Sequence, residues 1–261
     1  MSQSNRSRFS RNVRLAAAAA FTLSAAGQAV AVPLTLGTNV EVGDVAGNVF
    51  TPAPVASDPS DLNGLYTGVT FLLNGARQVS ASAGMFVLDQ RPTTGGPWDQ
   101  FLSFCLEPDV FLTPFSNPYR VDTLAGSGYL QANDPIGELW GRYRALVTND
   151  TNAAAFQVAL WELAYGTTDR DLADGAFRLT NNSGDMVYET AQGWLTSLDG
   201  TGPKADGLVV LVNNQQMADR QDLLTQTTSV PEPGTLALLA LGLVGLGWSR
   251  QQKLHRSTTA A

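Results

Sequence analysis

Few residues of this chain are suited to covalent or acid–base chemistry, because its 261 residues include one histidine, His255, and one cysteine, Cys105. A single histidine near the C-terminal end leaves Ser-His-Asp and Cys-His catalysis without a base, and histidine zinc sites without a ligand set. We therefore expect no conventional catalytic residues, no metal site and no cofactor. Cys105 is the side chain whose reactivity has to be explained.

Cys105 lies in the nearly continuous apolar run Phe101–Leu106, within a strand expected over Trp98–Leu106. Continuous apolar runs are typical of strands that are buried on both faces. One cysteine cannot form an internal disulfide. Its thiol is therefore expected to be buried, paired with another molecule, or chemically used.

Gln157 is a second notable residue, on a helix expected over Ala153–Tyr165. It lies four positions before Trp161 and hence on the same face of that helix. The helix is apolar on nearly every side, which predicts that the Gln157 amide is buried. A buried amide without partners costs roughly 1–3 kcal/mol, and a bond to Cys105 would remove its NH2 group altogether.

The motifs Phe104-Cys105-Leu106 and, 52 positions after the cysteine, Phe156-Gln157-Val158-Ala159-Leu160-Trp161 resemble those of bacterial surface thioester domains. The resemblance implies that the Cys105 sulfur is bonded to the side-chain carbonyl of Gln157, with loss of ammonia. It also implies a shield of Phe104, Phe156 and Trp161 around the bond. Many members of that family have Thr where this chain has Phe156.

The alternative interpretation needs no bond. Cys105 is then a small buried hydrophobe, and the Gln157 amide is hydrogen-bonded to the backbone. Under this interpretation the chain is a non-covalent structural surface protein.

Acidic residues give weaker candidates. Glu107 and Asp109 could form the acid pair of a secreted hydrolase, but Pro108 interrupts the strand that would align them. The acids at Asp169–Asp174 do not have the spacing of a calcium loop, so a solvated turn is favoured there. A hydrolase is therefore the least favoured function.

The C-terminal region combines Pro231-Glu232-Pro233 with an uncharged apolar segment, Leu236–Trp248, and a basic tail after it. As a helix this segment would cover roughly 20 Å of a hydrocarbon core about 30 Å thick. We expect a short transmembrane helix with its basic end in the cytoplasm.

This order of motif, apolar helix and basic tail over 230–256 resembles the PEP-CTERM sorting signal of Gram-negative bacteria. The resemblance implies that Pro231, Glu232 and Pro233 are recognised by an exosortase, and that the helix is a temporary anchor in the inner membrane. The mature protein is then expected at the cell surface or outside the cell. Its expected partner is an exopolysaccharide or a surface ligand that bears a nucleophile.

The first 31 residues have the features of a secretory signal peptide: four arginines, an apolar stretch, and the small residues Ala29 and Ala31 at the expected cleavage site. Of the 16 Lys and Arg residues, four lie before residue 32 and three lie after residue 248, and neither of these end segments carries any of the 23 acidic residues. The region from 32 to 248 therefore has a formal charge of −14. Nucleic acid is not expected as a partner.

Between the signals, strands are expected over Leu65–Leu73 and Gln78–Leu88 around an Asn74-Gly75 turn, with a further strand at 207–212. Besides the helix at 153–165, helices are expected from Asp134 to Val147 and over 185–198. This pattern predicts an α+β fold with a mainly antiparallel sheet or sandwich and a helical insertion.

The expected parts are a signal peptide (1–31), a Pro/Thr/Gly-rich segment (32–62), the α+β thioester-like domain (63–213), a polar linker (214–229), the sorting signal (230–256) and a tail (257–261).

Overall fold

The computed structural model describes residues 34–44, 64–110, 112, 116–166, 170–180, 185–213 and 220–227. In chain order the elements are β1 (Asn39–Gly43), β2 (Leu65–Leu73), β3 (Arg77–Pro92), β4 (Asp99–Cys105), β5 (Asn117–Asp122), α1 (Pro135–Tyr143), a 3₁₀ turn (Arg144–Leu146), α2 (Asp150–Tyr165), β6 (Phe177–Leu179), α3 (Met186–Ser197), β7 (Leu208–Asn213) and β8 (Leu223–Gln226).

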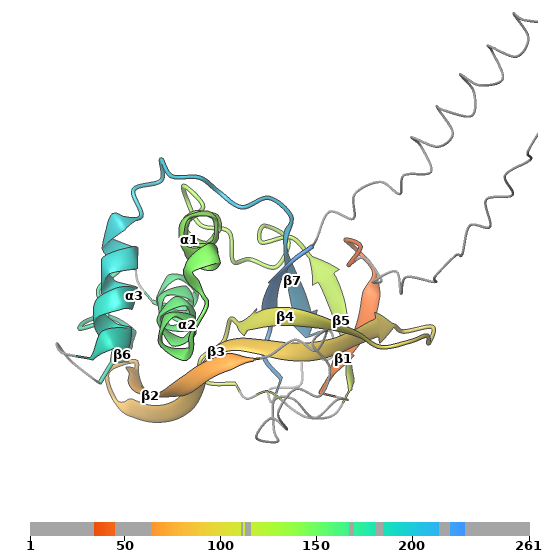
Figure 1. Ribbon diagram of the computed structural model, residues 1–261, viewed down its shortest axis with the longest axis horizontal. Helices are drawn as coiled ribbons and strands as arrows, with labels where there is room; N and C mark the ends of the chain where they lie inside the picture. The colour runs from red at the N-terminus through yellow and green to blue at the C-terminus, as the bar shows by residue number, and fades with distance from the viewer. Residues whose placement is uncertain are drawn as a thin grey trace, which may run out of the picture. The chain divides into compact units, whose positions relative to one another are not determined.

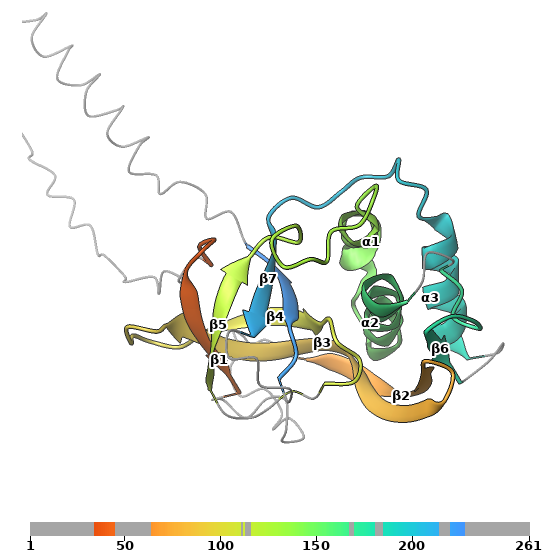
Figure 2. The same ribbon diagram turned by 180° about the vertical axis from the view of Figure 1, so that it is seen from behind.

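Six of these strands close into an antiparallel barrel in the order β1-β5-β7-β8-β4-β3, with β3 returning to β1. The three helices and β6 are inserted between β5 and β7 and lie beside one end of the barrel (Figures 1 and 2). The expected antiparallel sheet with a helical insertion is therefore confirmed. The sheet closes on itself, however, and does not form a sandwich.

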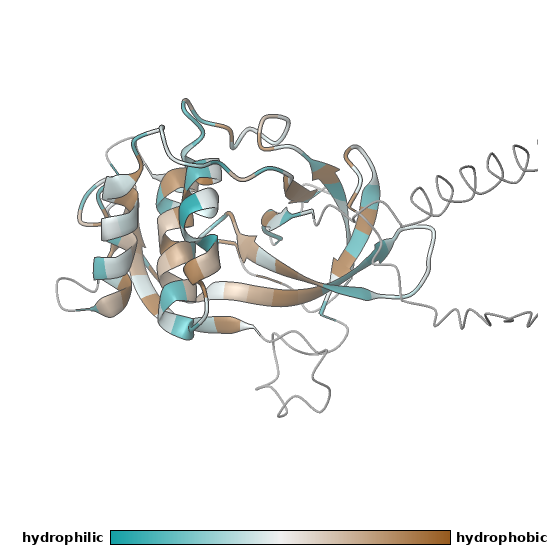
Figure 3. Ribbon diagram, turned by 45° about the horizontal axis from the view of Figure 1, so that its top comes forward, coloured by the Kyte–Doolittle hydropathy of each residue, from teal (hydrophilic) through white to brown (hydrophobic). Residues whose placement is uncertain are grey.

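Strand β3 belongs to two parts of the sheet. Its first half pairs with β2 as far as the Leu65–Met85 pair, and its second half pairs with β4 and β1. The β2–β3 turn has positive φ at both Asn74 (50°) and Gly75 (72°), as the sequence predicts for an Asn-Gly hairpin. Figure 3 shows β3 hydrophobic in its middle and hydrophilic towards its C-terminal end.

Each helix begins at a polar N-cap. The side chains of Asp134, Asn149 and Asp185 accept hydrogen bonds from main-chain N–H groups in the first turns of α1, α2 and α3. Helix α1 ends at Tyr143, earlier than the expected Val147. A 3₁₀ turn follows because the chain must become extended by Asn149, the cap of α2.

Helix α2 is the centre of the helical part. It packs against β2, β3, β4 and both other helices, and its residues from Ala153 to Leu163 are all buried. This burial agrees with the expectation of a helix that is apolar on nearly every side. Three consecutive alanines, 153–155, allow neighbouring elements to approach it closely.

Strand β8 lies within the segment 214–229, which the sequence predicted to be a polar linker. Leu223 and Leu224 are fully buried, and β8 pairs with β7 on one side and β4 on the other. Without β8 the barrel would not close, so residues 223–226 belong to the domain. The strands β5 and β6 were also not predicted.

Candidate functional site

The environment of Cys105 is set by the separation of β3 and β4. These strands pair only as far as Phe86 and Ser103, and β4 continues to Cys105 without β3 beside it. On its other side Cys105 pairs with Leu223 of β8. A polar main-chain group left unpaired in such a buried position is costly, so the edge of β4 needs another partner.

Gln157 of α2 is that partner. Its Oε1 accepts a hydrogen bond of 2.9 Å from the Cys105 N–H, and its Nε2 donates one of 2.6 Å to the Cys105 carbonyl. The amide thus takes the place of a peptide group on the missing strand. Gln157 is fully buried, as expected, and it lies in direct contact with the residue to which the thioester resemblance pairs it.

The Cys105 thiol is buried and un-ionised at neutral pH. Burial, together with the nearby negative charge of Glu107, raises the pKa of this thiol far above its usual range. Because the thiolate is the reactive form, the free thiol would react slowly with dissolved reagents.

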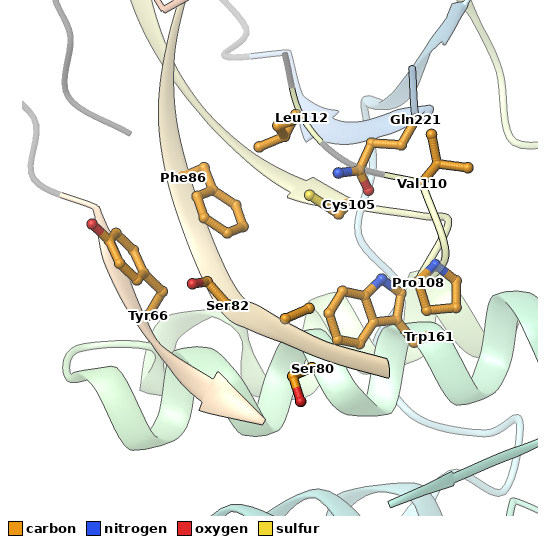
Figure 4. A pocket seen from close by; sticks show the side chains of 11 residues that line it. Tyr66, Ser80, Ser82, Phe86, Cys105, Pro108, Val110, Leu112, Trp161 and Gln221 are labelled. Carbon is orange, nitrogen blue, oxygen red and sulfur yellow. The ribbon is translucent and has the colours of Figure 1, made fainter. Parts of the chain in front are cut away.

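A cavity of about 340 Å³ lies in the region where β3 and β4 separate. Cys105 and Trp161 form part of its wall, Tyr66 and Phe86 line it from β2 and β3, and Gln221 completes it from the segment before β8 (Figure 4). The side chains in its lining are uncharged. The cavity therefore places the sulfur of Cys105 beside a mainly apolar space.

Two buried polar atoms in the cavity wall have no hydrogen-bond partner in the described part of the chain. They are the indole Nε1 of Trp161, a residue 2% exposed, and the amide Oε1 of Gln221, a residue 4% exposed. In Figure 4 the amide group of Gln221 and the nitrogen edge of the Trp161 indole both lie near Cys105. Buried polar groups are usually paired, so these two atoms are open to a ligand that enters the cavity.

The aromatic residues expected to shield Cys105 lie in two places. Trp161 lines the cavity, as expected, whereas Phe104 and Phe156 are absent from its lining. Their ring centroids are 4.6 Å apart, and both rings pack edge-on against Trp140 of α1. They therefore pack on the side of the β4 end that faces away from the cavity.

The sequence did not identify Tyr66, Phe86 or Gln221. No local pattern could have done so, because these residues meet Cys105 only through β2–β3 pairing and barrel closure. Gln221 in particular lay in the segment interpreted as a linker.

Glu107 and Asp109, the acid pair considered for a hydrolase, each bind a different partner. Glu107 accepts a hydrogen bond of 2.7 Å from the Asp222 N–H, whereas Asp109 forms an ion pair of 3.0 Å with Arg77. Asp222 in turn accepts from Tyr129 and from the Asn213 N–H. Burial is the main cause that raises the pKa of both Glu107 and Asp222.

The aspartates considered for calcium are used in a turn. Asp171 and Asp174 accept hydrogen bonds from the N–H groups of Ala173 and Gly175, and Asp169 lies outside the described residues. Across the described ranges, no three His, Cys, Asp or Glu residues are grouped as metal ligands would be.

In a comparison with known families, residues 229–251 match the PEP-CTERM protein-sorting motif. The prediction of a PEP-CTERM sorting motif at this end of the chain is therefore confirmed, and the recognition role of Pro231, Glu232 and Pro233 stays a prediction. The class of protein follows from the match. The chain is an exosortase substrate, exported through a membrane-anchored precursor and ending on the cell surface or outside the cell. It matches none of the curated proteins with which it was compared.

The terminal signals themselves lie outside the described residues. This applies to the signal peptide with Ala29 and Ala31, to the sorting motif, and to the expected anchor at 236–248. None of the helices that the structure describes is both long and apolar enough to span a membrane.

Proposed function

We propose that the exported domain is a covalent adhesin. The sulfur of Cys105 and the side-chain carbonyl carbon of Gln157 form a thioester, which a nucleophile on a partner at the cell surface or in the exopolysaccharide matrix then opens. The observation that supports this proposal most directly is the contact of the fully buried Gln157 amide with Cys105, beside a cavity that the Cys105 side chain lines.

The two hydrogen bonds of Gln157 suit the formation of the bond. The Cys105 N–H polarises the carbonyl that the sulfur attacks and can stabilise negative charge on its oxygen, as donors in oxyanion holes do. The Cys105 carbonyl holds the Nε2 group that leaves. The S–C bond forms, the C–N bond breaks, and the thiol proton departs with the NH2 group as ammonia.

Opening the thioester reverses the roles of these groups. A nucleophile of the partner bonds to the Gln157 carbonyl carbon, the C–S bond breaks, and the proton of the nucleophile passes to the Cys105 sulfur. The burial that raises the pKa of this thiol also makes its thiolate a strong base. The same burial keeps bulk water away from the bond before a partner arrives.

The intact mass of the mature protein tests the proposal. We expect the folded protein to be lighter than its processed sequence by one molecule of ammonia, and to gain the mass of methylamine when incubated with it. Cys105→Ala and Gln157→Leu should both have their full calculated mass. Full mass in the wild type, with Cys105 alkylated after denaturation, would refute the bond.

A non-covalent surface protein is the second candidate. It is favoured by the same pair of hydrogen bonds, because they complete the edge of β4 without any covalent chemistry. Under this function Gln157 serves only to pair the main chain of Cys105. The mass measurement separates the two candidates directly.

Sorting can be tested independently of the domain. Glu232 lies between the two prolines of the matched motif, so we expect Glu232→Ala to leave the precursor in the inner membrane. Immunoblots of membrane and culture fractions report this outcome. A variant processed at the wild-type rate would show that this carboxylate is not read by the exosortase.

A further inference from the structure

We infer that the cavity beside Cys105 is a binding site for an alcohol hydroxyl carried by a sugar or another polyol, and that this hydroxyl opens the thioester to give an ester on Gln157. The inference rests on the proposed function, and names the chemical class of its partner. The observations that carry it are the two unpaired polar atoms in the cavity wall and the uncharged lining around them.

The unpaired atoms differ in what they require. The indole Nε1 of Trp161 is a donor only, whereas the Oε1 of Gln221 is an acceptor. A hydroxyl group suits either atom, because its oxygen can accept from the indole and its hydrogen can be donated to the amide oxygen, and a polyol offers several such groups. Leaving either atom buried and unpaired costs about 1–3 kcal/mol, so a ligand that pairs both is favoured.

Charged groups fit this pair poorly. An ammonium group has no lone pair to accept from the Trp161 N–H, and a carboxylate has no hydrogen to donate to Gln221. The side chains that line the cavity carry no countercharge for either ion. A neutral amine has the right atoms, but only about one lysine side chain in 10³ is neutral at pH 7.

The remaining walls favour a ligand with an apolar face and several hydroxyls. The rings of Tyr66 and Phe86 are stacked with their centroids 5.5 Å apart, and both line the cavity. The exposed Ser80 and Ser82 line it as well and can donate or accept further hydrogen bonds. A volume of about 340 Å³ suits a small cyclic or branched polyol.

The transfer balances without any further reagent. The hydroxyl oxygen bonds to the Gln157 carbonyl carbon, the C–S bond breaks, and the hydroxyl proton passes to the Cys105 sulfur. The product is an ester on the Gln157 side chain and a free Cys105 thiol.

The test compares ester and amide formation in the mature protein, followed by intact mass and peptide mapping. Glucose and glycerol should each give an ester at Gln157 that hydroxylamine removes. Trp161→Phe keeps the ring but loses the N–H, and Gln221→Leu loses the acceptor. We expect each to lower the rate of ester formation, relative to the methylamine rate of the same variant, at least about 10-fold.

Trp194→Phe is the matched control, since Trp194 of α3 is buried but does not line the cavity. It should leave both rates unchanged. The inference is overturned if methylamine reacts but neither alcohol does, or if Trp161→Phe and Gln221→Leu slow both reactions equally. An ester formed with N-acetylthreonine amide but with neither polyol would replace the sugar with a peptide as the source of the hydroxyl.

A second measurement does not depend on the bond. In Cys105→Ala, the NMR resonance of the Trp161 indole N–H should shift saturably with glucose, and should not shift with methylammonium chloride. No shift with glucose would overturn the inference even where the wild type has lost ammonia. A shift with glucose, combined with full wild-type mass, would refute the thioester and leave a non-covalent polyol site.

Discussion

Two glutamines in this domain bind the main chain in the same manner but in different surroundings. Gln157 of α2 holds both polar groups of Cys105. Gln192 of α3 accepts from the Leu172 N–H at 2.9 Å and donates to the Arg170 carbonyl at 3.0 Å. A helix glutamine that pairs with a neighbouring main chain is thus a repeated structural device in this fold.

The surroundings distinguish the two. Gln192 is only partly buried, also bonds to Thr196, and borders a hollow of about 500 Å³ whose lining includes the charged residues Arg170 and Asp171. Gln157 is fully buried and lies against a residue with a thiol. Hydrogen bonding to the main chain alone therefore does not indicate chemistry. The thiol, the full burial and the unpaired atoms of the nearby cavity set the Cys105 site apart.

The largest difference should appear in stability. In a Cys105→Ala background, which cannot form the thioester, Gln157→Leu leaves the main-chain N–H and carbonyl of residue 105 buried without partners, at about 1–3 kcal/mol for each group. Gln192→Leu removes similar bonds at a site where water can replace them, and should cost about 0.5–1.5 kcal/mol for each bond. Urea unfolding of both variants measures the difference. Equal losses would show that burial of Gln157 adds nothing to its pairing with β4.

The second effect concerns the rate at which the Cys105 thiol is alkylated, a property that the Gln192 site does not have. In Gln157→Leu the thiol is free but remains buried, and burial holds its pKa far above the usual range. Alkylation by iodoacetamide at neutral pH should be slower than in the urea-unfolded variant by more than about 100-fold, since each pKa unit reduces the thiolate tenfold. Equal rates in the folded and unfolded protein would mean that the β4 end opens readily.

The smallest effect concerns the acids on the Cys105 side. Burial raises the folded-state pKa of Glu107 and Asp222, so the folded protein binds more protons than the unfolded chain between the ordinary and the raised pKa. Stability should therefore fall as the pH rises through that window.

Glu107→Gln keeps an oxygen that can accept from the Asp222 N–H and removes one of the two acids. Thermal unfolding of the variant should consequently depend less steeply on pH, and the variant should be more stable than the wild type above the window. A pH profile identical to that of the wild type would contradict this account of Glu107.

Local signals predicted much of the fold. The Asn74-Gly75 turn requires positive φ at both positions, and the caps at Asp134 and Asn149 act within one helical turn, so a short stretch of sequence is sufficient for each. Strand β8 could not be found in this way. Its four residues follow a polar stretch, and they are buried only because β7 and β4 lie on either side.

The residues of the candidate site also fall into two groups, those that local sequence predicts and those that depend on distant parts of the chain. Cys105 and Gln157 stand in recognisable motifs, and burial of the helix around Gln157 follows from its composition. The contribution of Gln221 depends on the course of the chain before β8, which no local pattern indicates. Phe104 points away from Cys105 because neighbouring residues of a strand lie on opposite faces, which the sequence could have indicated, whereas the packing of Phe104 and Phe156 on Trp140 of α1 could not be read from it.

Strand β8 also determines how closely the domain is coupled to its sorting signal. It ends at Gln226, and the matched motif begins at residue 229. Three residues reach at most about 10 Å even when fully extended. The expected recognition residues Pro231, Glu232 and Pro233 follow β8 by at most seven residues, so an enzyme that binds them has to act within about 25 Å of the end of β8. If a cell surface retains the processed end near this motif, the barrel will lie close to that surface.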